Sequence, residues 1–341
     1  MNFEALLKKK REVEVLRGQM ERNALRSFEQ DFLIEYTHNS TAIEGNTLTL
    51  IQTKVVLEDG ISVGGKTLRE IYEVVNHGKA FAYVQKCISE GRPLTENIVK
   101  DVHALLMENI LDGGIYRSVE VRISGAKHKP PAPSEMYYQV KEFYRALAAD
   151  HGMNPIELAA WTHAEFVKIH PFVDGNGRTS RMLMNYQLMA AGFLPVSIAK
   201  EKRLEYFETL EAYAVDGDLT PFAEMVASLE ERRLDEYLTL EQQQGEIGHT
   251  LYNRCGSRQR LLPFLFVKGE DKDILPKPRR YFTGRNAIPG QRKNAFCRLN
   301  SIYRTGRSSV KRSSLAAGWS SLCTDFWGIE NDSRRKADIK I

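Results

Sequence analysis

Apolar residues recur three or four positions apart along most of the first 240 residues, which is the period of an amphipathic helix. Apolar residues recur near this spacing over residues 3–36, which predicts one long helix. Capping residues or prolines open most of the later helices. These are expected over residues 49–58, 67–90, 95–111, 134–150, 155–169, 201–215 and 220–240. The pattern therefore predicts a mainly α protein.

One segment departs from the helical period. In residues 113–133, Val121 and Ile123 alternate with polar residues, and Ser124-Gly125 can form a turn before a run of prolines. Alternation of this kind around a glycine turn is typical of a β-hairpin. We therefore expect one hairpin among the helices.

Residues 38–46 allow two interpretations. Thr41-x-x-Glu44 fits a capping box at a helix start, whereas Glu44-Gly45 fits a helix that ends at a glycine. In the second case the Glu44 carboxylate would lie at the negative end of the helix dipole, which is unfavourable. A cation from elsewhere in the fold would then have to offset this cost.

The residues richest in chemistry lie at 170–181, with the sequence His-Pro-Phe-Val-Asp-Gly-Asn-Gly-Arg-Thr-Ser-Arg. An apolar helical stretch follows, so the glycines fall at a helix N-terminus, where unpaired N–H groups and the dipole attract phosphate. His170 can accept a proton near neutral pH. Asp174 offers oxygen ligands for Mg²⁺, and Arg178 and Arg181 can grip phosphate oxygens.

Together these residue types favour Mg²⁺-assisted transfer from a nucleotide to a hydroxyl group. A simpler interpretation is an Asn-Gly turn that caps a helix, with the arginines on a solvated face. That interpretation accounts for the glycines. It does not account for His170, Asp174 and two arginines within twelve residues.

This run resembles the signature of the Fic family, His-x-Phe-x-(Asp/Glu)-Gly-Asn-Gly-Arg-x-x-Arg, at every specified position. Upstream, Ser40-x-x-x-Glu44-Gly45 resembles the inhibitory helix that some Fic proteins carry before the core. The segment that begins at Gly114-x-Tyr116-Arg117 resembles the Fic flap. The resemblance implies a Fic-type helical domain with one β-hairpin flap over the active site.

The activity implied by the resemblance is protein AMPylation, in which AMP moves from ATP to a Ser, Thr or Tyr hydroxyl of a target protein or of the chain itself. His170 would be the base, Asp174 would hold Mg²⁺, and Glu44 would inhibit by pairing with Arg181. The other site residues implied are the nucleotide and phosphate contacts Gly175, Asn176, Gly177, Arg178, Arg181 and Tyr206, the inhibitory Ser40, and the flap residues Val121, Ile123 and Ser124.

Two other functions stay open at the sequence level. Some Fic proteins of this layout run the reverse reaction, so de-AMPylation at the same site is one alternative. A nucleic-acid-associated regulator that binds through a basic tail is an alternative of another class, although nucleic acid is not the expected partner. The resemblance is also compatible with a homodimer.

Composition divides the chain of 341 residues into unequal parts. The net charge is +4, but residues 245–341 hold 20 Lys and Arg against 8 Asp and Glu. We expect an N-terminal helical region with the inhibitory motif at 1–65, a catalytic core at 66–240 and a basic tail at 241–341. The tail lacks a helical or strand period, which favours a poorly ordered segment or one read out of its native frame.

No run of eighteen apolar residues occurs in the sequence, and the first residues lack the apolar core of a signal peptide. The four cysteines are too widely spaced for a disulfide scaffold or a paired zinc site. These features predict a cytoplasmic protein with reduced thiols and no membrane partner.

Overall fold

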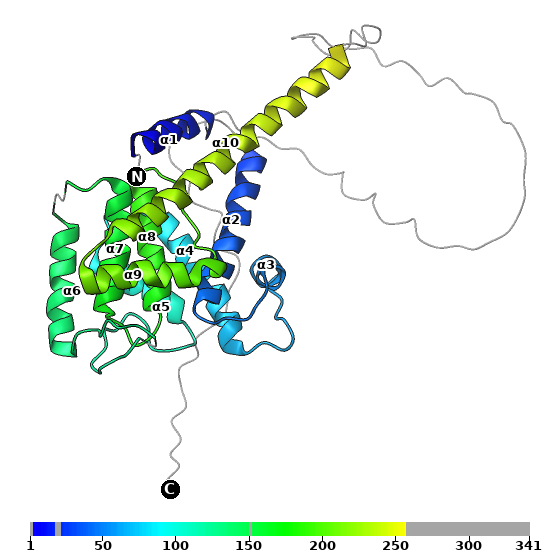
Figure 1. Ribbon diagram of the computed structural model, residues 1–341. Helices are drawn as coiled ribbons and strands as arrows, with labels where there is room; N and C mark the ends of the chain where they lie inside the picture. Colours follow the sequence, from blue (N-terminus) through cyan, green and yellow to red (C-terminus); the bar gives the residue numbers. More distant parts are fainter. Residues whose placement is uncertain (1–2, 18–21, 124, 150–151, 257–341) are drawn as a thin grey trace, which may run out of the picture. The chain divides into compact units, whose positions relative to one another are not determined.

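The computed structural model describes residues 3–17, 22–123, 125–149 and 152–256, with side chains up to residue 240 (Figure 1). It is a helical protein, and the described residues contain no β-strand. The α-helices are α1 (Phe3–Arg17), α2 (Arg22–Ile43), α3 (Leu50–Glu58), α4 (Leu68–Ser89), α5 (Glu96–Met107), α6 (Pro133–Leu147), α7 (Pro155–Ile169), α8 (Asn176–Ala190), α9 (Arg203–Asp216) and α10 (Thr220–Gly256), with a short 3₁₀ helix, η1 (Lys200–Lys202), before α9.

Helix α8 is the central helix of this arrangement. It lies beside α7, and α4, α5, α9 and α10 surround the pair (Figure 1). Met182, Leu183 and Met184 are consecutive and all fully buried, so α8 is covered on every side. A helix that is buried all round has little freedom to shift because its neighbours fix it. The residues at its first turn are therefore held in place.

Most predicted helices are confirmed within a few residues. Capping boxes start α3 at Thr49, α4 at Thr67 and α7 at Asn154, as the sequence indicates. Helix α5 ends at Met107 instead of 111, and Asn109 adopts a positive φ of 62° just beyond that end. Asn is one of the few residues that takes this conformation at small cost.

The single helix expected over residues 3–36 is wrong. The structure describes two helices there, α1 and α2, with residues 18–21 outside the described part. Arg17 of α1 and Glu29 of α2 form an ion pair at 3.0 Å, whereas twelve positions along one straight helix would span about 18 Å. The two segments are therefore not one straight helix, and an amphipathic period alone does not reveal where such a helix is interrupted.

The described residues of the segment 113–133 contain no β-hairpin either. Apart from Ser124, which lies outside the described residues, the segment is irregular. Side chains satisfy its backbone in place of a strand ladder. The guanidinium of Arg117 donates to the carbonyls of Val119 (2.9 Å) and Pro131 (2.6 Å), so it joins the two ends of the segment.

The C-terminal boundary expected at residue 240 falls inside α10, which continues to Gly256. The region upstream of residue 66 shares its hydrophobic clusters with the region downstream of it, for example Leu6 and Val13 with Phe222 and Tyr237. The predicted basic tail beyond residue 256 lies outside the described residues. Among the described helices, none is both long and apolar enough to cross a membrane.

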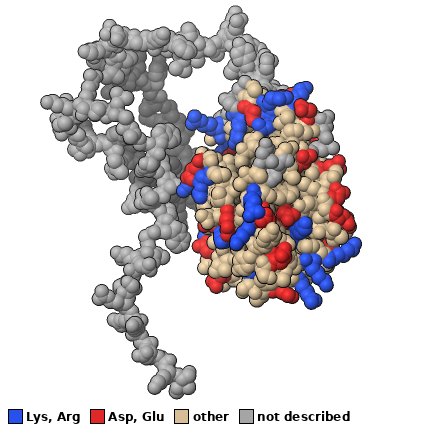
Figure 2. All heavy atoms as spheres, turned by 90° about the vertical axis from the view of Figure 1, so that its left-hand side faces the viewer, with Lys and Arg blue, Asp and Glu red and all other residues tan. Residues whose placement is uncertain are grey.

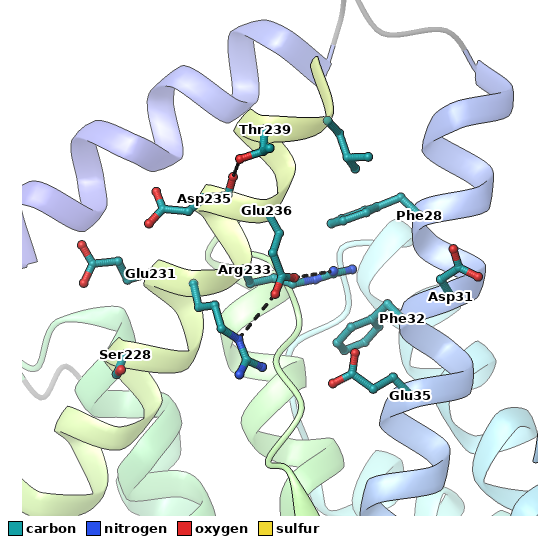
Figure 3. Close-up of a pocket in the computed structure, with 12 residues that line it drawn as sticks. Phe28, Asp31, Phe32, Glu35, Ser228, Glu231, Arg233, Asp235, Glu236 and Thr239 are labelled. Carbon is teal, nitrogen blue, oxygen red and sulfur yellow. Dashed lines mark hydrogen bonds and ion pairs between the residues drawn. The ribbon is translucent and has the colours of Figure 1, made fainter. Parts of the chain in front are cut away.

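A groove of about 720 Å³ lies between α2 and α10 (Figure 3). The guanidinium of Arg233 projects into it from α10 and stacks on the rings of Phe28 (3.7 Å) and Phe32 (4.6 Å) of α2. Carboxylates from both helices line the rest. None of the site residues expected from the sequence lines this groove. The groove is therefore separate from the expected site.

Glu230 is a buried carboxylic acid on α10, and it allows a prediction about stability. Its Oε1 accepts a hydrogen bond from the Leu194 N–H at 2.9 Å, and burial raises its pKa to about 8. An acid whose pKa is raised on folding destabilises the folded state as pH rises from about 4.5 to 8. In Glu230→Gln we expect a free energy of unfolding roughly 2–4 kcal/mol above wild type at pH 8 and equal to it at pH 4.5. Urea unfolding at both pH values measures this, and an equal difference at the two would contradict it.

Candidate active site

His170 ends α7 in a left-handed conformation, with φ 52° and ψ 59°. Its Nδ1 lies 3.1 Å from the carbonyl oxygen of Val167, which can only accept, so Nδ1 carries the proton and Nε2 is the basic nitrogen. The carbonyl of His170 in turn accepts from Arg117 Nε at 2.8 Å. Burial lowers the pKa of His170, which offsets the expected preference of a helix C-terminus for the protonated form. The imidazole is therefore neutral at neutral pH.

The loop after His170 is held from two sides. The side chain of Asn176 makes a two-point contact with Phe172: its Oδ1 accepts from the backbone N–H at 2.9 Å, and its Nδ2 donates to the carbonyl at 2.8 Å. The ring of Phe172 stacks on His103 with centroids 3.5 Å apart. Asn176 thus clamps the loop with its side chain, and only its backbone could contact a phosphate.

His103 of α5 supports the same loop, which the sequence did not reveal. Its Nδ1 accepts from the Gly114 N–H at 2.8 Å, so its Nε2 carries the proton and donates to the carbonyl of Asp174 at 2.9 Å. Burial lowers its pKa to about 4, which keeps the ring neutral. His103 therefore connects residue 114 to the loop.

The start of α8 is open to an anion. Gly175 precedes the helix with a φ of 78°, a conformation that favours glycine, and no side chain caps this helix. The first turn therefore presents N–H groups at the positive end of the dipole. A Cβ placed on Gly177 would overlap Oε1 of Glu44, so the absence of a side chain lets that carboxylate lie against the helix start.

Glu44 pairs with Arg181, which is only 1% exposed. Oε1 of Glu44 accepts from Nη2 of Arg181 at 2.8 Å. The same guanidinium donates to Ser40 twice, to its hydroxyl from Nε (3.0 Å) and to its carbonyl from Nη2 (2.8 Å). Ser40, Glu44 and Arg181 are thus in direct contact, although 137 to 141 residues separate the arginine from the other two.

This contact also decides between the two interpretations of residues 38–46. Helix α2 ends at Ile43, and Gly45 follows with a φ of 104°, so the C-terminal interpretation is correct. Thr41 does not form a capping box, because its hydroxyl donates to the carbonyl of Thr37 within the helix at 2.8 Å. The cation that offsets the carboxylate at the helix end is Arg181.

Tyr206 lies behind Arg181 in the core. It is 1% exposed, and its hydroxyl accepts from Arg181 Nη1 at 3.3 Å and lies 2.9 Å from His163 Nε2. Ser180 lies 3.1 Å from the same histidine nitrogen. The resemblance implied that Tyr206 contacts the nucleotide. In the structure its hydroxyl bonds to Arg181, and His163 contacts Tyr206 and Ser180 behind it.

The other arginine, Arg178, belongs to a cluster of four charged side chains. It lies 3.2 Å from Oδ1 of Asp174 and 3.2 Å from Oε1 of Glu73 on α4. Arg69, also on α4, contacts both of these carboxylates. Neither Glu73 nor Arg69 was expected from the sequence. The one signal available is that Glu73 shares a buried face of α4 with His77, an unusual place for a carboxylate.

Asp174 is the candidate ligand for Mg²⁺. Burial alone would raise its pKa, but Arg178, the Gly175 N–H and Arg69 together hold the pKa below its usual value, so the carboxylate is ionised. Among the described residues no group of three or more His, Cys, Asp or Glu side chains could hold a metal ion. One carboxylate suits a Mg²⁺ ion that is bound mainly through substrate phosphates and water. The residues present fit a metal that arrives with a nucleotide.

Residues 113–133 are anchored beside this loop. The N–H of Arg117 donates to the carbonyl of Pro171 at 2.9 Å. Further along, the N–H groups of Lys127 and His128 both donate to Glu211 of α9, at 2.8 and 3.1 Å.

Of the three residues expected to form the flap, Val121 and Ile123 are half-buried in the segment, and Ser124 is outside the described part. The segment is thus anchored beside the loop, and its described residues contain no strand.

The chain resembles known proteins both in sequence and in structure. The sequence model of the Fic/DOC family matches residues 93–188. Fic-1 from C. elegans is 31% identical and superimposes with a TM-score of 0.62, over 70% of this chain and 74% of that one. The chain belongs to the Fic family. The residues that match the family model include α7, the loop that begins at His170 and nearly all of α8.

Other relatives agree. A Fic domain containing signaling protein from Bacteroides thetaiotaomicron is similar over 98% of its length and 71% of this chain, at 27% identity and a TM-score of 0.63. Proteins named protein adenylyltransferase Fic from Drosophila persimilis and Drosophila melanogaster are 36% identical over 220 and 219 residues, or 63% of this Fic chain. This chain spans 43% and 44% of the length of those two relatives.

Proposed function

We propose that this Fic protein is a protein adenylyltransferase that Glu44 inhibits. The observation that carries the proposal is the contact of Glu44 with both Arg181 and the glycine start of α8. A carboxylate there occupies the anion site that a nucleotide phosphate would need. The relatives named protein adenylyltransferase support the reaction class.

In the proposed reaction the hydroxyl oxygen of a protein side chain attacks the α-phosphorus of ATP. The new bond joins that oxygen to phosphorus, and the bond between the α-phosphorus and the bridging oxygen breaks, which releases pyrophosphate. Nε2 of His170 takes the hydroxyl proton, because Nδ1 already carries a hydrogen that it donates to Val167. The neutral state of His170 suits this role.

The phosphates would bind at the first turn of α8. The backbone N–H groups of Asn176 and Gly177 and the side chains of Arg178 and Arg181 can receive their charge, whereas the N–H of Gly175 already donates to Asp174. Asp174 would hold Mg²⁺, which when bound neutralises phosphate charge. In the present arrangement Arg181 binds Glu44 instead, so full phosphate binding requires this contact to open.

The target protein would bind at residues 113–133. The backbone of this segment is largely irregular and anchored at Arg117 and by Glu211, so residues near Val121 and Ile123 can pair with an extended peptide. The side chains of Ile115 and Val173 are 65% and 58% exposed near the loop and offer apolar contacts for that target.

Intact-mass analysis tests the reaction directly. The Glu44→Gly protein is incubated with Mg²⁺ and each of ATP, GTP, CTP and UTP in turn, and the mass added to the chain identifies both the donor and the transferred group. We expect an added AMP with ATP. Addition of a phosphate alone, or no added mass with any nucleotide, would contradict adenylyl transfer.

De-AMPylation is a second candidate, because the half-exposed Glu44 carboxylate faces the same phosphate site and could position a water molecule for the reverse step. Release of AMP from a modified target by the wild type, but not by Glu44→Gly, would support it.

Nucleic-acid binding has less support in the described part. On the face around α6, basic and acidic side chains are interspersed instead of forming one basic surface (Figure 2). The basic segment that motivated this alternative lies outside the described residues.

A further inference from the structure

Arg69 of α4 forms an ion pair that the proposed reaction does not use. Its Nη2 contacts Oδ2 of Asp174, and its Nε donates to Oε1 of Glu73 at 3.2 Å. The other oxygen of Asp174, Oδ1, accepts from the Gly175 N–H at 2.6 Å and from Arg178 Nη2 at 3.2 Å. A cation from α4 therefore occupies the one carboxylate oxygen of Asp174 that the loop and α8 leave available.

The four charges form a closed ring in which cations and anions alternate: Arg69, Asp174, Arg178 and Glu73. Their side chains differ in exposure. Arg178 and Glu73 are 2% and 9% exposed, Asp174 is 34% exposed, and Arg69 is 53% exposed. Removal of a buried member would leave a buried charge without its partner, which is costly. Arg69 can release Asp174 at little cost because exposed ion pairs are weak.

We propose that Arg69 competes with the divalent cation for the carboxylate of Asp174 and thereby sets the metal affinity of this site. The inference rests on the proposed function, in which Mg²⁺ reaches Asp174 together with a nucleotide. The metal carries two charges in a small volume and brings the phosphates with it, so it can displace a single guanidinium. Because Arg69 also pairs with Glu73, the displaced side chain stays close and repels the metal.

This contact differs from the contact made by Glu44. Glu44 is an anion that occupies the place of a phosphate at Arg181, whereas Arg69 is a cation that occupies the place of a metal at Asp174. Removal of Glu44 should therefore act on nucleotide binding, and removal of Arg69 on metal binding. Each can be measured without turnover.

Metal binding tests the inference on the full chain. Mn²⁺ serves as the probe, with the non-transferable donor α,β-methylene-ATP, and electron paramagnetic resonance measures the free Mn²⁺. All variants carry Glu44→Gly so that the phosphate site is open. The test change is Arg69→Gln. The matched control is Lys79→Gln, which removes a positive charge of similar exposure (50%) from the same helix.

We expect Arg69→Gln to lower the Mn²⁺ dissociation constant about five- to twentyfold, as the loss of one like charge a few ångströms from a divalent ion implies. Lys79→Gln should stay within about twofold of the Glu44→Gly parent, since Lys79 pairs with Glu108 and lies ten positions, or about 15 Å, further along α4, beyond the range of an exposed charge. Arg69→Lys keeps the charge but loses the planar guanidinium that can bond two carboxylates at once. Its Mn²⁺ dissociation constant should therefore fall between those of the parent and of Arg69→Gln. Thermal melting followed by circular dichroism checks that each variant folds.

The outcomes separate this inference from the proposed function. If Asp174→Asn weakens Mn²⁺ binding while Arg69→Gln and Arg69→Lys both match the parent, Arg69 does not compete with the metal, and the proposed function stands. If Asp174→Asn leaves Mn²⁺ binding unchanged, or the parent binds no Mn²⁺ with the nucleotide, the metal is not at Asp174 and both proposals are overturned.

Discussion

Replacement of Glu44 by glycine is expected to raise self-AMPylation about 10- to 100-fold. The carboxylate lies against the start of α8 and uses Nη2 of Arg181. Once it is removed, Arg181 can donate to a nucleotide phosphate, and a charge-assisted hydrogen bond of this kind contributes about 1.5–3 kcal/mol. Transfer of radiolabel from α-³²P-ATP to the chain measures the rate.

Glu44→Gln is the matched control for this prediction. It keeps the length of the side chain and removes the charge, so we expect a rate between those of the wild type and Glu44→Gly. Glycine beside Gly45 adds backbone freedom at the end of α2, and the glutamine variant separates that effect from the loss of charge. Equal rates in all three proteins would show that the contact between Glu44 and Arg181 does not control the reaction.

His170→Ala in the Glu44→Gly background is expected to lower transfer by about 10²–10⁴-fold, the usual contribution of a general base. Nucleotide affinity should change little, because His170 faces the hydroxyl in the proposed reaction and the phosphate contacts belong to α8. Calorimetric titration with ATP measures the affinity, and intact mass measures the transfer. A loss of both together would mean that His170 holds the loop in shape instead of moving a proton.

The pH profile of the Glu44→Gly protein adds a second readout for His170. Burial lowers the pKa of His170 below its ordinary value of 6.5. The base is the neutral form, so activity is lost only as pH falls through this lowered pKa. We therefore expect the rate at pH 6.5 to stay above half of its plateau. A half-maximum above pH 6.5 would contradict this.

The positions of the helices followed from local signals. Thr49, Thr67 and Asn154 cap their helices through bonds to residues two or three positions away, so the sequence carries the whole interaction. Local signals failed where a partner came from elsewhere. Residues 113–133 alternate like a hairpin, but the buried guanidinium of Arg117 bonds their carbonyls, and no local pattern shows that an arginine will be enclosed there.

The sequence alone determined which chemical groups gather in the loop from His170 to Arg181, because these residue types lie within twelve positions around one helix start. It also supplied Glu44 as a candidate partner for Arg181. Only the tertiary structure decided that the two meet, that Tyr206 lies behind the arginine, and that Arg69 covers Asp174. These contacts join residues 25 to 137 positions apart. Their formation depends on how α2, α4 and α9 pack around α8, and packing is a property of whole helix surfaces that a local pattern does not contain.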